Sequence, residues 1–321
     1  MSVLILTAFT LVAFAANSLL CRMALGEHLI DPVSFTTLRL GSGALALILI
    51  FRLGGNSKRP REAIGSWGSG FALFAYAIAF SLAYVSLNTG MGALILFGSV
   101  QVTMIGAALK SGENLGTMQW IGLAAAICGL IYLVMPGLSA PEPFGALLMC
   151  IAGIAWGVYS IRGKGISSPV TMTAGNFARS APMAIIASVI AYSAIHLELH
   201  GIMLALLSGV VMSGLGYVLW YKALRGLTTT QASVVQLLVP VLAAFGGIAF
   251  LSEKLSARLI AASALILGGV ALVVIKRSAK GTKRRANLTT KLNRPGMDRS
   301  QQKVGVNGIS CRSATALDDQ C

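Results

Sequence analysis

Two arginines lie within long apolar stretches, where a charged side chain has few partners. Arg39 follows Pro32, and Arg179 follows Thr171, in each case by about two helical turns. A guanidinium keeps its proton, so in an apolar setting it needs an anion, carbonyl oxygens or water. One hypothesis is that these arginines hold a carboxylate or phosphate of a substrate. The alternatives are that helix-end carbonyls, the lipid interface or a water-filled vestibule satisfies them.

Uncharged polar and aromatic side chains in the same stretches are the other candidates for substrate contact. Amide and hydroxyl groups can bind a substrate, but they also join neighbouring helices, which is their commoner role. Both interpretations stay open. The candidate substrate-binding residues are Arg39, Arg179, Asn17, Tyr84, Trp156, Tyr159, Asn176, Tyr221 and Gln236.

The carboxylates before the tail lie in loops or at the ends of the apolar stretches. No Asp or Glu falls near the middle of one, so the sequence contains neither a buried proton relay nor the nucleophile, base or metal set of an enzyme. His196 and His200 have a metal-like spacing, but both fall in one short loop without further ligands. We expect no catalytic residue, no metal and no cofactor. Coupling through a helix-end carboxylate such as Glu113 or Glu253 remains possible, as does exchange or facilitated export.

The composition places these residues in a membrane protein. Apolar residues make up 56% of the chain and charged residues 11%, whereas a soluble domain carries about 25% charged residues. A helix needs roughly 20 apolar residues to cross a bilayer, which predicts an all-α polytopic protein with about ten transmembrane helices. The predicted spans are 2–24, 32–51, 67–87, 90–109, 118–135, 144–161, 171–195, 202–224, 230–251 and 257–275.

The second half of the chain repeats features of the first. Tyr84-Val85-Ser86-Leu87 recurs as Tyr221-Lys222-Ala223-Leu224, and Asp31-Pro32 recurs as Ser168-Pro169. Because each copy holds an odd number of predicted spans, the two copies must lie upside down relative to each other, as in many alternating-access transporters. The predicted domains are a first five-helix repeat (1–137), a second five-helix repeat (138–275) and a disordered, basic cytoplasmic tail (276–321).

Lysine and arginine placement predicts the orientation. The loops after the second, sixth and eighth spans are basic, and those on the other side hold few basic residues. We therefore expect a multi-pass protein of the inner or plasma membrane with both termini in the cytoplasm. The basic cluster at 276–285 could hold anionic lipid headgroups, or it could be a simple positive-inside signal. We expect the bilayer and a small-molecule substrate as partners, and no nucleic acid.

Residues 3–275 resemble the EamA-like family of the drug/metabolite transporter superfamily. The resemblance rests on the two halves and on a pattern that ends each of them. In the second half this pattern is Pro240, Glu253-Lys254-Leu255-Ser256 and Gly268-Gly269. In the first half it is Glu113-Asn114-Leu115 and Gly129, with Val100 in place of the proline.

The resemblance implies export or exchange of small metabolites, often amino acids or related compounds, through a cavity between the repeats. It also implies that Glu113 and Glu253 organise the turn into the following helix. Pro240, in the middle of its predicted span, should kink the helix and shape a cavity. The alternatives are a carrier for a nucleotide-linked or lipid-linked sugar, and a membrane scaffold that transports nothing.

Overall fold

The structure is a computed structural model that describes residues 2–53, 65–110, 116–135, 140–163, 166, 168–227, 235–269 and 271–272. This part of the chain is helical, apart from turns and one isolated β-bridge between Ile30 and Leu197. The predicted tail (276–321) and Glu113 lie outside the described residues.

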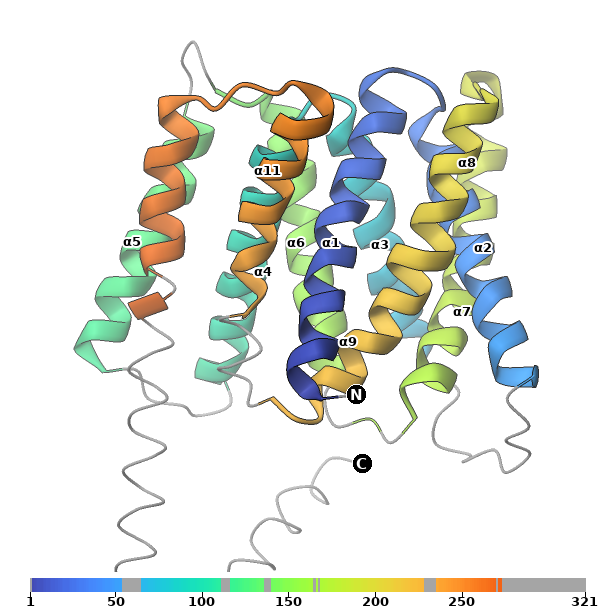
Figure 1. The fold of residues 1–321 in the computed structure, drawn as a ribbon, viewed down its shortest axis with the longest axis horizontal. Helices are drawn as coiled ribbons and strands as arrows, with labels where there is room; N and C mark the ends of the chain where they lie inside the picture. Colours follow the sequence, from blue (N-terminus) through green and yellow to red (C-terminus); the bar gives the residue numbers. More distant parts are fainter. Residues whose placement is uncertain are drawn as a thin grey trace, which may run out of the picture. The chain divides into compact units, whose positions relative to one another are not determined.

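The helices lie side by side within the unit Met1–Val274, and their order follows the predicted spans (Figure 1). α5 lies at one edge in this view and α2 at the other. A further helix, Ala257–Gly269, follows α11. The labelled helices are α1 (Val3–Gly26), α2 (Pro32–Leu53), α3 (Trp67–Tyr84), α4 (Thr89–Lys110), α5 (Thr117–Val134), α6 (Pro143–Arg162), α7 (Pro169–Ile190), η1 (Tyr192–Ala194), α8 (Leu199–Leu207), η2 (Ser208–Leu215), α9 (Gly216–Leu224) and α11 (Leu238–Leu251).

Three of these helices begin at a capping residue followed by proline, which is why the sequence starts them where it does. Pro32, Pro143 and Pro169 each occupy the first helical position, where their missing N–H costs nothing. The Asp31 carboxylate accepts hydrogen bonds from the Val33 and Ser34 N–H groups at 3.1 and 2.8 Å. Its backbone also pairs with His196, which ties the loop before α2 to the loop before α8.

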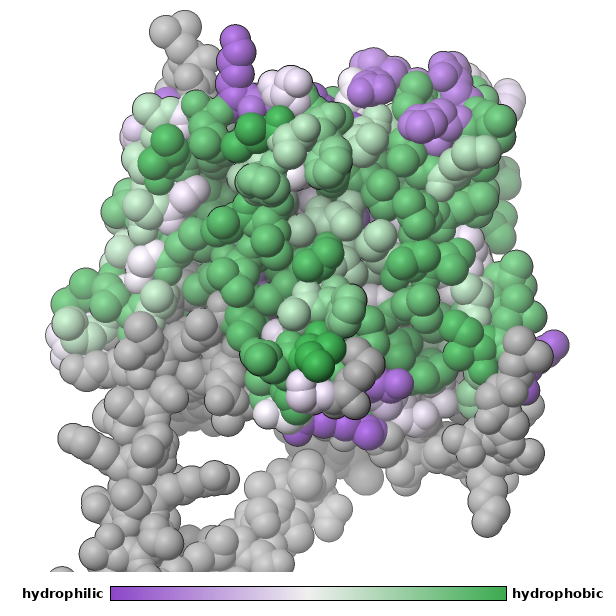
Figure 2. All heavy atoms as spheres, in the orientation of Figure 1, coloured by the Kyte–Doolittle hydropathy of each residue, from purple (hydrophilic) through white to green (hydrophobic). Residues whose placement is uncertain are grey.

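Six helices in the described part of the chain are long and apolar enough to cross a membrane: Val3–Gly26, Pro32–Arg52, Trp67–Tyr84, Thr89–Ala107, Pro143–Arg162 and Leu199–Leu224. Trp120–Leu133, Leu238–Leu251 and Ala257–Gly269 are apolar but shorter. α7 has 22 residues, but Asn176 and Arg179 lower its hydropathy. One face of the molecule is a continuous apolar surface with polar residues at its two ends (Figure 2), as lipid contact requires.

Helices from the two halves of the chain pack against each other in pairs. α2 contacts α7, α4 contacts α11, α3 contacts α6, and α1 contacts the continuous run α8–η2–α9. α4 and α6 also approach closely, because a Cβ at Gly153 would lie 2.5 Å from the Leu96 carbonyl oxygen. Small residues at such contacts let membrane helices come together.

Two predicted spans differ from continuous α-helices. The span predicted at 202–224 contains a π-helix, η2, between α8 and α9. The helix that holds Pro240 is interrupted, because a turn at Leu237 separates the helical residues Val235 and Gln236 from α11, which begins at Leu238. Proline cannot donate to the carbonyl four residues earlier, which here is that of Gln236, so the interruption lies where Pro240 is expected to cause one.

A network of charged and backbone groups joins four segments at the end of the bundle where α4 begins. The Glu253 carboxylate accepts hydrogen bonds from the Thr89 N–H (2.8 and 2.9 Å) and the Thr89 hydroxyl (3.0 Å). Arg22 Nε lies 3.8 Å from Glu253, and Arg22 Nη1 donates to the Tyr84 and Val85 carbonyls at 3.0 and 2.9 Å. Glu253 therefore caps α4. Ser256 caps the helix that follows Glu253, because its hydroxyl accepts a hydrogen bond from the Leu259 N–H.

The substitution Glu253→Gln should destabilise the folded protein by about 1–3 kcal/mol, because it removes a mostly buried carboxylate that satisfies Arg22 and the start of α4. The apparent melting temperature in detergent should fall by several degrees. Glu198→Gln is a matched control, since the His196–Glu198 pair is about half exposed and should contribute little. Equal melting temperatures for the two variants would contradict this account.

Candidate functional site

Arg39 lies in the interior of the bundle, 1% exposed, and its partners are neutral. Its Nε donates to the Ser213 hydroxyl at 2.8 Å, and its Nη2 donates to the hydroxyls of Tyr76 (3.1 Å) and Tyr217 (2.9 Å). Its guanidinium carbon also lies 5.2 and 5.1 Å from the ring centres of Tyr76 and Phe80. Its Nη1 has no hydrogen-bond partner, and no carboxylate pairs with Arg39 in the part of the chain that the structure describes.

The π-helix η2 supplies part of this hydrogen-bond network. Ser208 and Ser213 both donate to the Asn17 side-chain oxygen, at 2.7 and 3.4 Å. These serines are five residues apart. In an α-helix their side chains would point in directions roughly 140° apart, whereas the i→i+5 bonding of a π-helix brings them to one face. Gly209 makes the approach possible, because a Cβ there would collide with the Arg39 carbonyl oxygen and the Ser42 hydroxyl.

Five aromatic rings from four helices surround the arginine. The Trp156 ring lies 4.7 Å from that of Tyr217, 5.0 Å from that of Tyr76 and 5.5 Å from that of Phe14. Tyr76 also packs on Phe80 at 5.2 Å. The Trp156 Nε1–H is a second buried donor without a partner. We call these residues the aromatic cage: Phe14, Tyr76, Phe80, Trp156 and Tyr217.

The aromatic cage encloses a small cavity at the centre of the bundle. Asn17, Ser18, Leu96 and Phe97 complete its lining. The cavity measures ≈ 10 Å³, which is about the space of one water molecule. The site is thus closed in this structure, and a metabolite could enter only if the surrounding helices moved apart.

Arg179 does not join Arg39, although the sequence suggested related places for the two. Arg179 is partly exposed, donates to the Gly175 carbonyl oxygen of its own helix at 3.0 Å, and lies 5.9 Å from the Trp67 ring centre. The expected pairing needed a one-turn insertion in the second half. Without this insertion, the two halves are related by one constant offset in residue number, which matches Pro32 with Pro169 and Tyr84 with Tyr221. The same offset matches Arg39 with Asn176.

The other candidates fall into separate places. Tyr159, Asn176 and Tyr221 meet near the end of the bundle opposite Glu253. There, Asn176 Nδ2 donates to the Tyr159 hydroxyl at 3.4 Å and the Ser66 N–H donates to Asn176 Oδ1 at 3.1 Å. The Tyr159 and Tyr221 rings are 5.9 Å apart. Tyr84 lies beside the Glu253 network, where its hydroxyl donates to the Thr89 carbonyl oxygen at 3.3 Å.

Gln236 is fully buried just before α11. The structure therefore brings Arg39, Asn17 and Trp156 together. The Tyr159 ring adjoins this group at 5.5 Å from the Trp156 ring, and the Tyr84 ring at 4.7 Å from the Phe80 ring. The remaining candidates, Arg179, Asn176, Tyr221 and Gln236, lie outside the aromatic cage.

Several residues of the site were not among the sequence candidates. Tyr76 and Tyr217 bind the arginine, and Ser208 and Ser213 complete its network. The sequence held a signal for the two tyrosines. Tyr76 lies in the same predicted span as Tyr84, and Tyr217 lies in the same predicted span as Tyr221, and Tyr84 and Tyr221 are equivalent residues of the two halves. The serines had no such signal, because their alignment depends on the π-helix.

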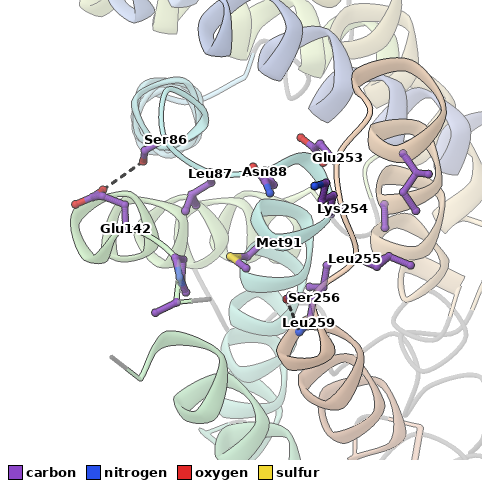
Figure 3. Close-up of a pocket in the computed structure, with 15 residues that line it drawn as sticks. Ser86, Leu87, Asn88, Met91, Glu142, Glu253, Lys254, Leu255, Ser256 and Leu259 are labelled. Carbon is purple, nitrogen blue, oxygen red and sulfur yellow. Dashed lines mark hydrogen bonds between the residues drawn. The ribbon is translucent and has the colours of Figure 1, made fainter. Parts of the chain in front are cut away.

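A larger cavity of ≈ 230 Å³ opens at the end of the bundle that holds Glu253 (Figure 3). Ser86, Asn88, Glu142 and Lys254 line it with Glu253. Its carboxylates are already engaged, because Glu142 accepts from the Gly145 and Phe144 N–H groups and from Ser86. These backbone donors hold the pKa of Glu142 below its usual value. The cavity is therefore a vestibule built on helix caps, and its described carboxylates are already engaged.

Comparison with known proteins places the chain in a family. Residues 143–275 match the EamA-like transporter family. An uncharacterized protein of Pseudomonas aeruginosa is 48% identical over 87% of this chain and 97% of its own length. A probable amino-acid metabolite efflux pump of Escherichia coli is 23% identical over 83% of this chain and 92% of its own length. The uncharacterized transporter YoaV of Bacillus subtilis is 23% identical over 77% of this chain and 89% of its own length.

A protein crystal structure with 19% sequence identity has the same fold, with a TM-score of 0.59 over 84% of this chain and 97% of the other chain. The extended similarity to transporters agrees with the apolar helices and the buried site. The chain belongs to the EamA-like family of the drug/metabolite transporter superfamily, and it is a multi-pass membrane transporter.

Proposed function

We propose that the protein exports or exchanges a small metabolite, an amino acid or a related compound, by alternating access, and that Arg39 anchors the substrate. The observation that carries this proposal is the buried guanidinium with neutral partners and an unpaired Nη1. A charge in an apolar bundle is costly and is usually retained for function. The printed name of the Escherichia coli relative, a probable amino-acid metabolite efflux pump, supports the same class of substrate.

The proposed architecture is ten transmembrane helices in two inverted repeats, 1–137 and 138–275. The packing pairs support it, because α3 on α6 has its counterpart in α8–η2–α9 on α1, while α2 meets its own counterpart α7. Hydrogen bonds support opposite directions for corresponding helices. Tyr84, at the end of α3, lies near Thr89 and the Glu253 network, whereas Arg225 follows α9 and donates to the Ile166 carbonyl oxygen at the other end.

Closure at both ends supports a rocking mechanism. The Arg22–Glu253–Thr89 network closes one end, and the contacts of Ser66, Asn176 and Tyr159 close the other. A central cavity of only ≈ 10 Å³ supports assigning the structure, within this proposal, to an intermediate closed to both sides. Opening one network while the other stays shut would expose Arg39 to one side of the membrane at a time.

A sugar nucleotide or lipid-linked sugar fits this site less well, because a diphosphate calls for several cations and, among the described residues, Arg39 is the one cation in contact with the aromatic cage. From the placement of lysine and arginine, we propose the inner membrane with both termini in the cytoplasm. Contact between the tail (276–321) and anionic lipids belongs to the same proposal.

Arg39→Gln should abolish most transport, because it removes the proposed anchor for an anionic group. The protein is expressed in a bacterial host, and carboxylate metabolites released into the medium are quantified by mass spectrometry against an empty-vector strain. We expect at least one amino acid or related compound to accumulate with the natural chain, and its release to fall at least about tenfold in Arg39→Gln.

Arg179→Gln is the matched control and should keep export, since Arg179 bonds to its own helix outside the cage. Arg39→Lys keeps the charge, and the amount of folded protein in the membrane is measured for each variant. Absence of any released compound, or unchanged release by well-folded Arg39→Gln, would refute the proposal.

The inverted repeats predict that corresponding positions face opposite sides of the membrane. Asn88 and Arg225 are both exposed and occupy equivalent places after Tyr84 and Tyr221. In a cysteine-free background, a membrane-impermeant maleimide added to intact spheroplasts should label Asn88→Cys, and should label Arg225→Cys only after lysis. Labelling of both from the same side would rule out inverted repeats, and the reverse pattern would overturn the proposed orientation.

A further inference from the structure

We infer that the aromatic cage selects an organic monoanion, a carboxylate on an apolar or aromatic body, and discriminates against compounds that carry a free ammonium group. This inference rests on the proposed function and narrows the substrate class of the same site. It depends on which hydrogen-bonding groups the cage still has available, on its charge and on the nature of its walls.

The groups left without partners in the cage are donors. Arg39 Nη1 and Trp156 Nε1 are both buried and have no acceptor. They flank the same two rings, because Arg39 Nη2 donates to the Tyr76 and Tyr217 hydroxyls and Trp156 packs on both rings at 5.0 and 4.7 Å. A buried donor without an acceptor is costly, so a ligand with acceptor oxygens would recover that energy at two points. A carboxylate, with two acceptor oxygens, fits both donors.

The acceptors that line the cavity carry no charge. The Asn17 oxygen already accepts from Ser208 and Ser213, and the residues that line the cavity include no Asp or Glu. An ammonium group has three donors and a full charge, and its transfer into such a site would cost solvation energy without a compensating anion. It would also be repelled by Arg39. A free amino acid would therefore lose binding free energy through desolvation of its ammonium group, and a carboxylate without an ammonium group would not.

The walls of the cavity favour an apolar body. Phe14, Phe80, Leu96 and Phe97 offer only carbon surface, and Trp156 and the two tyrosines offer ring faces. Such surfaces bind apolar and aromatic groups through area burial and ring packing. The hydroxyls of Tyr76 and Tyr217 occupy Arg39 Nη2 in the closed cavity, and an entering carboxylate would have to displace or share them.

A set of compounds with one common body tests the inference. The detergent-purified full chain is titrated with 3-phenylpropionate, phenylalanine, phenethylamine, 3-phenylpropionamide and phenyl phosphate, and binding is measured by calorimetry and by the thermal shift. We expect 3-phenylpropionate to bind at least about tenfold more tightly than each of the others. Binding of 3-phenylpropionate should be lost in Arg39→Gln, weakened several-fold in Trp156→Phe, which keeps a ring but removes the N–H, and unchanged in Arg179→Gln.

Phenylalanine or phenethylamine binding as tightly as 3-phenylpropionate would overturn the exclusion of ammonium groups, and tighter phenyl phosphate binding would overturn the choice of a carboxylate. Absence of binding by all five compounds would also overturn the inference. None of these results would contradict the proposed function if the release of metabolites from cells still depended on Arg39. Trp156→Phe and Arg39→Lys keep the test valid should Arg39→Gln fail to fold.

Discussion

The positive charge of Arg39 is the constraint on which the centre of this bundle depends. A guanidinium cannot shed its proton, and the surrounding helices are apolar, so every group around it must lower the cost of its burial. Hydroxyls of Tyr76, Ser213 and Tyr217 do so by accepting its hydrogen bonds, and the Tyr76 and Phe80 rings by facing it. These partners come from three separate elements, so one side chain holds α2 against α3, η2 and α9.

The polar contacts at the two ends of the bundle solve a different problem. Helix termini leave backbone groups unsatisfied, and near a membrane water is a limited partner. Here neighbouring segments meet that need: Glu253 caps α4, Arg22 binds the carbonyls that end α3, and Ser66 binds Asn176 of α7. Because each contact joins two segments rather than closing within one, opening an end of the cavity requires these bonds to break together. That coupling suits a carrier that must not open both ends at once.

The sequence predicts the helices better than the site. Apolar length and the Asp31-Pro32 and Ser168-Pro169 starts place α2 and α7, since they depend on local chemistry. The partner of Glu253 is not local, because the Glu253 carboxylate caps α4 at Thr89, which is distant in the sequence. The residues around Glu253 therefore do not predict this contact. Arg39 and Arg179 look alike in sequence, and only packing separates a core charge from a partly exposed one. The π-helix, which aligns Ser208 with Ser213, left no pattern to read.

The proposed repeats differ where the chemistry lies. The spacing that relates the two halves pairs Arg39 with Asn176, so the proposed duplication retains the scaffold but not the charge. The Asn176 amide donates to the Tyr159 hydroxyl and accepts from the Ser66 N–H, so it forms a neutral contact between segments. A second arginine there would add a like charge to an interior whose described lining has no carboxylate, and the two would repel in a medium of low dielectric constant. In the proposed mechanism, two similar halves thus provide opposed movements, while a single cation limits the proposed substrate site to one anionic group.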